Sequence, residues 1–245
     1  MGDKILSVRG LGIKFGSRSV IRNLSFDVCA GDNLAIIGPN GAGKTVLLKA
    51  LLNFLSYEGE IRWAPNARIG YVPQKIAADR QMPVCVGDLL AAKAHVLKLS
   101  SARIGAVTSL VDLNPEILNT SIGTISGGQF QKALIAFALL GEPNVLLFDE
   151  PTASLDELAE ERIYDLLERL QREQQLTILL VSHDLSIVYR AATKVLCVSK
   201  DLVCFGPPRE VLTPSALEAM YSAPAKYYQH RRDIYDVSSN RKQHD

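Results

Sequence analysis

The sequence predicts an α/β fold in which buried strands alternate with helices, and three features indicate it. The first is a glycine-rich segment at 38–45, which separates an apolar strand, 34–37, from a helical pattern. The second is a pair of apolar runs at 145–150 and 177–181, which have the composition of strands covered on both faces. The third is a stretch from about 75 to 124 that contains helical patterns and no strand. We therefore expect an α/β core with a helical insertion.

Length and composition are those of an ordinary globular chain. It has 245 residues, of which 47% are hydrophobic and 22% are charged, and its net charge is +1. This balance gives no reason to expect a nucleic acid partner. The longest apolar runs, such as 133–140, are far shorter than the ~18 residues that span a bilayer, and the first residues lack the apolar core of a secretion signal. The four cysteines form no CxxC pair, so we expect reduced core cysteines in preference to a metal site or a disulfide.

Segment 38–45 reads GPNGAGKT and fits the phosphate-binding pattern of Gly, four residues and Gly-Lys-Ser/Thr. Its glycines let backbone N–H groups turn toward phosphate oxygens, and the following helix adds the positive end of its dipole. Lys44 can then reach the β- and γ-phosphates, and the Thr45 hydroxyl can bind Mg²⁺. The pattern predicts a nucleoside triphosphate site formed by Gly38, Pro39, Asn40, Gly41, Ala42, Gly43, Lys44, Thr45 and Val46.

Two further residues each admit two interpretations. Phe15 lies near a probable turn among the short strands expected over 5–28, and it is either a half-buried strand aromatic or a platform for an adenine ring. Gln74 follows a strand expected at 68–72. It is either a polar loop residue or a ligand, through its carbonyl oxygen, of Mg²⁺ or the attacking water.

The insertion ends at a second glycine pair. Its helices are expected at 86–97, 101–111 and 115–118. Next, Ser126, Gly127, Gly128 and Gln129 open an apolar helix over 132–140, and by the same physics they form a second anion-binding helix start. Two such sites are hard to explain within one active site. We therefore expect the second to face the nucleotide of another copy of the chain.

Two carboxylates, Asp149 and Glu150, end the apolar run at 145–150. They are either solvated loop charges or, after a phosphate-binding loop, an Mg²⁺ ligand (Asp149) and the base for the hydrolytic water (Glu150). We favour the second interpretation because ligands bind at the carboxyl ends of parallel strands. His183 follows the strand at 177–181, at the same edge, and we expect it to contact the γ-phosphate.

The last elements are a core helix, a hairpin and a tail. One apolar stripe marks the helix as core packing, and it consists of Ile163, Leu166, Leu167 and Leu170. Segments 194–199 and 202–205 resemble a closing hairpin, and residues from about 224 onward are polar and tail-like.

Taken together, these motifs resemble those of the ATP-binding cassette (ABC) ATPases. The family's order and spacing are matched by GPNGAGKT (38–45), Gln74, ISGGQ (125–129), VLLFDE (145–150), SLD (154–156) and His183. Each motif is weak alone and the set is specific. The resemblance covers residues 5 to 222, nearly the whole chain.

The resemblance implies a P-loop NTPase with a RecA-like core, an antiparallel β subdomain and an inserted α-helical subdomain. It places the cassette at 1–222, with the helical subdomain at about 75–140, and a polar tail at 223–245. It implies a head-to-tail homodimer with two ATPs between the subunits, in which Lys44 and Thr45 of one copy face Ser126 and Gly128 of the other.

The resemblance also implies roles for single residues. Glu150 would polarise water, His183 would position it against the γ-phosphate, and Asp156 would link the two sites across the interface. Two departures stand in the helix after ISGGQ, because Lys132 and Phe137 occupy positions where the family commonly has arginine. Phe137 would lose a charged contact near the dimer face.

Within the family, the chain is most similar to the ATPases of zinc and manganese importers. The similarity lies in RIGYVPQK (68–75) with Asp79 and Met82-Pro83 after it, in 181–198 and in 203–206. The tail has only His230 and His244, whereas zinc-importer relatives often carry a His-rich tail.

Such ATPases bind membrane permeases at the cytoplasmic face, as peripheral subunits, and are served indirectly by an external solute-binding protein. The sequence leaves three alternatives open: an importer ATPase for another cargo, a soluble cassette ATPase acting on DNA or ribosomes, and an inactive nucleotide-binding module.

Overall fold

The strands form two separate sheets in the computed structural model of the chain, which describes residues 2–74, 84–152, 155–199 and 203–221. The smaller sheet is antiparallel in the order β2-β1-β4, and its strands are β1 (Lys4–Phe15), β2 (Arg18–Cys29) and β4 (Glu58–Trp63). The larger sheet has the order β5-β6-β7-β3-β8-β9. Its strands are β3 (Asn33–Ile37), β5 (Ile69–Val72), β6 (Val145–Asp149), β7 (Thr177–Val181), β8 (Lys194–Val198) and β9 (Val203–Gly206).

The larger sheet is parallel except at one edge. Strands β5, β6, β7, β3 and β8 run parallel, and β9 pairs antiparallel with β8. Every residue of β3, β6 and β7 is buried, as their continuous apolar sequences predict. This confirms the expected α/β class and brings the carboxyl ends of three predicted strands to one edge.

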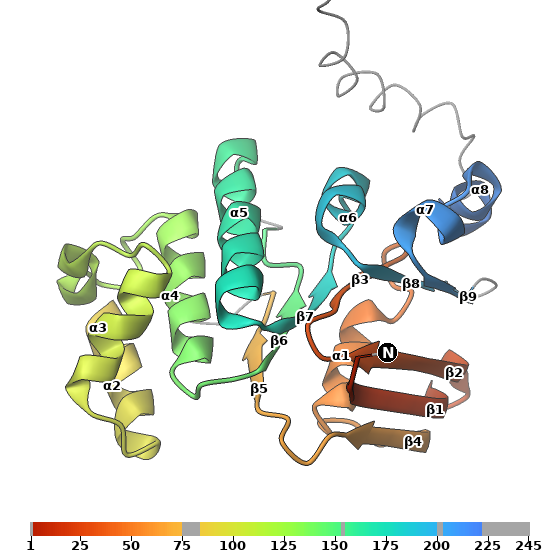
Figure 1. The fold of residues 1–245 in the computed structure, drawn as a ribbon, viewed down its shortest axis with the longest axis horizontal. Coiled ribbons are helices and arrows are strands. Elements are labelled where there is room, and N and C mark those ends of the chain that lie inside the picture. Colours follow the sequence, from red (N-terminus) through yellow and green to blue (C-terminus); the bar gives the residue numbers. More distant parts are fainter. Residues whose placement is uncertain (1, 75–83, 153–154, 200–202, 222–245) are drawn as a thin grey trace, which may run out of the picture.

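Helices gather at one end of the molecule and flank the larger sheet elsewhere (Figure 1). They are α1 (Lys44–Leu51), α2 (Val86–Val96), α3 (Ser101–Leu110), the 3₁₀ helix η1 (Pro115–Asn119), α4 (Gly127–Leu139), α5 (Glu157–Gln174), α6 (Leu185–Ala191), α7 (Pro208–Val211) and α8 (Pro214–Tyr221). Among the described residues, none of these helices is both long enough and apolar enough to cross a bilayer.

The predicted insertion is helical where the structure describes it. Helices α2, α3 and η1 agree with expectation, and a short antiparallel bridge joins Cys85 to Ser121. Residues 75–83, which include Asp79, Met82 and Pro83, lie outside the described residues, as does the tail with His230 and His244. Two details differ from expectation. Helix α4 begins at Gly127, before the apolar run that predicted it, and the short strands expected over 5–28 are two strands of 12 residues each.

The two faces of the larger sheet pack against different hydrophobic clusters, as β6 shows. Leu146 and Phe148 of β6 face a core shared with α4, α5 and the insertion, whereas Val145 and Leu147 face a core shared with α1 and the smaller sheet. This alternation follows from the two-residue period of a strand. The predicted stripe of α5 lies in the first core, and it consists of Ile163, Leu166, Leu167 and Leu170.

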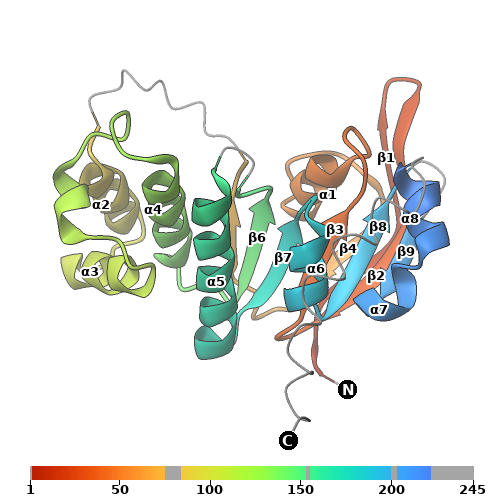
Figure 2. The ribbon, with the colours of Figure 1, turned by 90° about the horizontal axis from the view of Figure 1, so that it is seen from above.

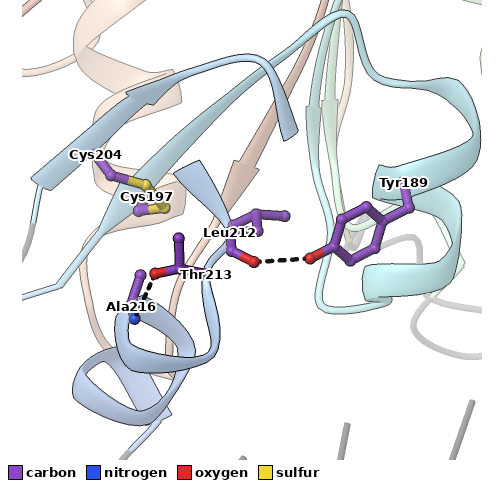
Figure 3. The surroundings of a disulfide bond; sticks show 6 residues. All are labelled: Tyr189, Cys197, Cys204, Leu212, Thr213 and Ala216. Atoms are coloured by element: carbon purple, nitrogen blue, oxygen red, sulfur yellow. Dashed lines mark hydrogen bonds between the residues drawn. A yellow bond between two sulfur atoms is a disulfide. The ribbon is translucent and has the colours of Figure 1, made fainter. Parts of the chain in front are cut away.

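The expectation that all four cysteines are reduced is wrong for two of them. Cys197 and Cys204 are joined by a disulfide (Figure 3). The β8–β9 register places them directly opposite each other with Cα atoms 4.8 Å apart, which is within the range that a disulfide requires. Spacing along the chain hid this pair because the hairpin register, not a CxxC motif, brings the two thiols together. Cys29 and Cys85 are free among the described residues.

Candidate nucleotide-binding site

The predicted phosphate-binding loop joins β3 to α1 and is held close to two other strands. Gly38 has a φ of 153°, and a Cβ there would overlap the carbonyl oxygen of Val198 at the end of β8. Gly43 has a φ of 103°, and a Cβ there would lie 2.7 Å from Val20 of β2. Both conformations and both approaches require glycine. The loop therefore has its shape because the neighbouring strands leave no room for a side chain.

The amino end of α1 is open to an anion. Its N-cap is Gly43, so no side chain of the described residues caps the helix, whereas most helix starts satisfy their first N–H groups with a capping side chain. Unsatisfied N–H groups and the helix dipole together favour a phosphate at this position.

Lys44 extends back over this loop and is almost fully buried. Its Nζ donates hydrogen bonds to the carbonyl oxygens of Gly38 at 2.9 Å and Pro39 at 3.3 Å. The same nitrogen lies 3.5 Å from Oε1 of Glu150. The ammonium group is therefore positioned between the loop backbone and the carboxylate at the end of β6.

Thr45 and Asp149 form a pair of oxygen donors beside the loop. The Thr45 hydroxyl donates a hydrogen bond to Oδ1 of Asp149 at 2.9 Å. Burial raises the pKa of Asp149, the bond from Thr45 opposes that shift, and the nearby charge of Glu150 adds to it. Such a pair suits Mg²⁺, which is held by one or two carboxylates together with the phosphates of its substrate.

Tyr71, a residue that the sequence did not single out, stands beside this pair. Burial, followed by the charge of Asp149 and a hydrogen bond to it, raises the pKa of Tyr71 to about 12. The phenol therefore stays protonated and contributes a hydroxyl group, not a charge, next to Asp149.

Glu150 is held from two sides in an uncommon backbone conformation. Gln74 donates a hydrogen bond from Nε2 to its Oε2 at 2.7 Å, and the other oxygen, Oε1, contacts Lys44. The φ of Glu150 is 46°, in the left-handed region that residues other than glycine rarely adopt. Backbone outliers of this kind are concentrated at active sites.

His183 lies at the same edge of the sheet. It follows β7 after Ser182, and β7 pairs in parallel with β6 so that Asp149 is opposite Val181. The backbone N–H of Glu150 also donates to the carbonyl oxygen of Val181 at 3.2 Å. The side chain of His183 is exposed, so it can contact a group bound above the loop.

Phe15 ends β1 at the tip of the β1–β2 hairpin, where half of its surface is exposed. The same hairpin carries Val20, which lies against Gly43 of the phosphate-binding loop. The ring is therefore accessible on an element that contacts the loop, as an adenine platform requires.

The segment of Ser126, Gly127, Gly128 and Gln129 lies elsewhere. Ser126 caps α4, and the Ser126 and Gln129 side chains each bond the other residue's backbone N–H group, in a capping box. The Cβ position of Gly128 is 3.6 Å from Ala159 in the first turn of α5. Both views place α4 beyond α5 from α1 (Figures 1 and 2). The structure thus brings Lys44, Thr45, Gln74, Asp149 and Glu150 together, and it does not bring the second glycine pair to them.

The two departures from the family pattern have structural explanations. Lys132 donates from Nζ to the carbonyl oxygen of Asp112. Phe137 is stacked under Lys93 of α2, whose Nζ lies 4.2 Å from the ring centroid and donates to the Phe137 carbonyl oxygen at 2.6 Å. Phe137 therefore has a charged neighbour, Lys93, within the same chain.

Comparison with known proteins agrees with this geometry. The ABC transporter family model matches residues 21–153. The chain belongs to the ABC transporter family. It is 34% identical to a zinc import ATP-binding protein, ZnuC, of Pseudomonas entomophila, covering 97% of this chain and 93% of that one. It is 36% identical to ZnuC of Paracoccus denitrificans, with coverage of 88% and 85%.

Solved structures of the family share the fold. A chain of an inward-facing ABC transporter, provisionally assigned to the metal-chelate type, aligns with a TM-score of 0.83 and 30% identity over 91% of this chain and 90% of that one. This ABC ATPase accordingly has the expected P-loop NTPase fold, with a RecA-like core, an antiparallel β subdomain and a helical subdomain. It binds and hydrolyses ATP, as the family's ATPases do.

Proposed function

We propose that this ABC ATPase is the nucleotide-binding subunit of an importer for divalent metal ions, with zinc as the first candidate cargo and manganese as the second. The observation that carries the cargo proposal is its identity of 34–36%, over most of the chain, with ZnuC relatives that are named for zinc import. None of the candidate site residues contacts a cargo ion in this proposal, so the cargo rests on that relationship alone.

The site residues divide into groups that bind and groups that react. The backbone of the 38–43 loop, Lys44 and Val46 bind the phosphates, and the exposed ring of Phe15 stacks on the adenine. Thr45, Asp149 and Gln74 hold the Mg²⁺ of MgATP, which neutralises the developing charge on the phosphates. The Thr45–Asp149 hydrogen bond supports this assignment because it fixes two oxygen donors side by side.

Glu150 is the base that polarises the hydrolytic water, and His183 positions that water against the γ-phosphate. Their supporting observation is the paired register of β6 and β7, which ends both strands at one edge. In the described state the Glu150 carboxylate is held by Lys44 and Gln74. A bound γ-phosphate would compete for Lys44 and release one side of the carboxylate.

The assembly is a homodimer in which each nucleotide lies between two chains. Ser126, Gly127, Gly128 and Gln129 of one copy bind the ATP held by the 38–45 loop of the other. The wide separation of these two segments within one chain supports this arrangement (Figure 2). The dimer is a peripheral protein that binds permease subunits at the cytoplasmic face of the membrane. An external solute-binding protein serves it indirectly. In each chain the cassette is 1–222, with the helical subdomain at about 75–140, and 223–245 is a tail.

The function is tested with cells that lack this chain, grown under zinc limitation and separately under manganese limitation. We expect a growth defect under zinc limitation, with lowered cell zinc, that the wild-type chain restores and Lys44→Ala does not. A defect relieved by manganese alone would reassign the cargo. Normal growth and metal content under both limitations would contradict the metal assignment altogether.

A further inference from the structure

Three buried hydroxyl groups form a connected chain behind the candidate site. The phenol oxygen of Tyr164, on α5, lies 3.1 Å from Oγ1 of Thr152 and 3.4 Å from Oγ of Ser182. All three residues are at least 95% buried, with exposed fractions of 3%, 4% and 2% for Tyr164, Thr152 and Ser182. Buried hydroxyl groups need hydrogen-bond partners, and these three are hydrogen-bonded to one another in a row.

The direction of these bonds follows from the protons available. Thr152 donates its single hydroxyl proton to the Glu160 carboxylate at 2.7 Å, so the bond between Thr152 and Tyr164 uses the phenol proton. The Tyr164 oxygen can then accept from Ser182, whose own oxygen accepts from the backbone N–H of Asp184 at 3.1 Å. One ordered chain therefore runs from Ser182 through Tyr164 and Thr152 to a carboxylate, and its members polarise one another.

The two ends of this chain lie next to the proposed reacting groups. Thr152 follows Glu150 by two residues, and Ser182 directly precedes His183. Both segments leave neighbouring parallel strands, β6 and β7, at the same edge. The Tyr164 hydroxyl thus ties the segment that carries the water-polarising carboxylate to the segment that carries the histidine.

We propose that Tyr164 is a positioning residue for ATP hydrolysis, whose hydroxyl fixes the spacing between Glu150 and His183. This proposal rests on the roles given above to those two residues. Without the hydroxyl, Thr152 loses a donor and Ser182 loses an acceptor, so each segment can move independently. Because a misplacement of 1 Å can lower a rate by up to about a hundredfold, the effect is on turnover and not on nucleotide binding.

The test is Tyr164→Phe in the purified full-length chain, since phenylalanine fills the same buried space. We expect kcat for ATP hydrolysis to fall about tenfold while KM for ATP changes by less than twofold. The matched control is Tyr189→Phe. That residue, on α6, also donates its hydroxyl proton to an internal acceptor, the Leu212 carbonyl oxygen at the end of α7, at 3.0 Å (Figure 3). This bond does not join the segments after β6 and β7, so its removal should leave kcat unchanged.

Double variants separate positioning from general loss of packing. Thr152→Val and Ser182→Ala should each lower kcat, and combining either with Tyr164→Phe should lower it little further, because residues that act as one unit are not additive. Additive losses would overturn the proposal. A lowered melting temperature with unchanged kcat, or a change in KM alone, would also overturn it, since each is what a purely structural tyrosine produces.

A comparison with Glu150→Gln distinguishes a failure of the Tyr164 proposal from a failure of the role proposed for Glu150. If Glu150→Gln is inactive and Tyr164→Phe is fully active, only the role of Tyr164 is wrong. If Glu150→Gln hydrolyses ATP at the wild-type rate, the roles of Glu150 and Tyr164 both fail. The growth experiment on metal cargo is independent of either result.

Discussion

Asp149 shows, at the scale of one residue, how a group in a candidate binding site can lower the stability of the fold. Burial raises its pKa above the ordinary 3.8, so ionising this carboxylate costs folding free energy. The contribution of Asp149 to the free energy of unfolding is most favourable below the ordinary pKa, where the carboxyl group is protonated in both the folded and the unfolded state. It declines as the pH rises through the raised pKa of the folded state.

Asp149→Asn should therefore be more stable than the wild type near neutral pH when nucleotide and Mg²⁺ are absent. The melting-temperature difference should grow from pH 4 to pH 7, and each kcal/mol corresponds to about 2–4 °C in a chain of this size. Differential scanning calorimetry measures it. The control is Asp156→Asn, an exposed helix cap that asparagine replaces well. MgATP should stabilise the wild type and Asp156→Asn more than it stabilises Asp149→Asn. A difference that stays flat with pH contradicts the prediction.

Residues with a fixed local pattern could be predicted, and residues inside regular elements could not. Lys44 and Thr45 begin a helix and Asp149 ends a strand, and at these positions their chemistry has no competing explanation in packing. Tyr71 and Tyr164 sit in a strand and a helix, at positions where the period of the element calls for a buried side chain. Only the fold shows that their hydroxyl groups face the site.

At the scale of elements, the contact between α2 and α4 includes a lysine from one helix stacked on a phenylalanine from the other. Lys93 stacks on Phe137, where the family commonly has arginine, and burial lowers the pKa of Lys93. Phe137→Arg would place a second cation against a half-buried one. We expect it to lower the free energy of unfolding by about 1–2 kcal/mol, the size of a partly desolvated cation–π contact.

Urea denaturation measures this change. Lys93→Met in the Phe137→Arg background should recover most of the loss, because it removes the repulsion. Lys132→Arg is the matched control, since it also restores a family arginine but bonds only a backbone carbonyl group. If Phe137→Arg is as stable as the wild type, the stacked lysine contributes nothing.

The sequence predicted which segments are helices and strands better than it predicted how the strands pair. The apolar strands and the helices of the insertion were predictable because each obeys one period over its length. The length of β1 and β2 was not, because both strands have irregular register that breaks the alternating pattern. The Cys197–Cys204 bond was likewise a matter of register between two strands.

At the scale of the whole molecule, the separation of the two glycine segments supports the proposal that one chain holds only half of each nucleotide site. In the Glu150→Gln background, ATP should accumulate a dimer that gel filtration detects. Adding Ser126→Asp should abolish that dimer, because its charge would face the γ-phosphate of the partner's nucleotide.

Ser126→Asn is the control, since asparagine caps a helix as well as aspartate does but carries no charge. It should dimerise far better than Ser126→Asp, and ATP binding to the monomer should be equal in both. Dimerisation that is the same for Asp and Asn would mean that Ser126 does not face a nucleotide. The motifs predicted that the site is divided between copies, and the structure adds the separation of the two segments within one chain.

The left-handed backbone of Glu150 has an evolutionary consequence. Glycine or asparagine adopts this conformation more easily, and either would remove a carboxylate that repels Asp149. Laboratory evolution for heat resistance alone would therefore tend to replace this glutamate. Under the role proposed for Glu150, the selected variants would be more stable and would still bind ATP, but they would not hydrolyse it. A screen on this chain must therefore select for ATP turnover and thermal stability together.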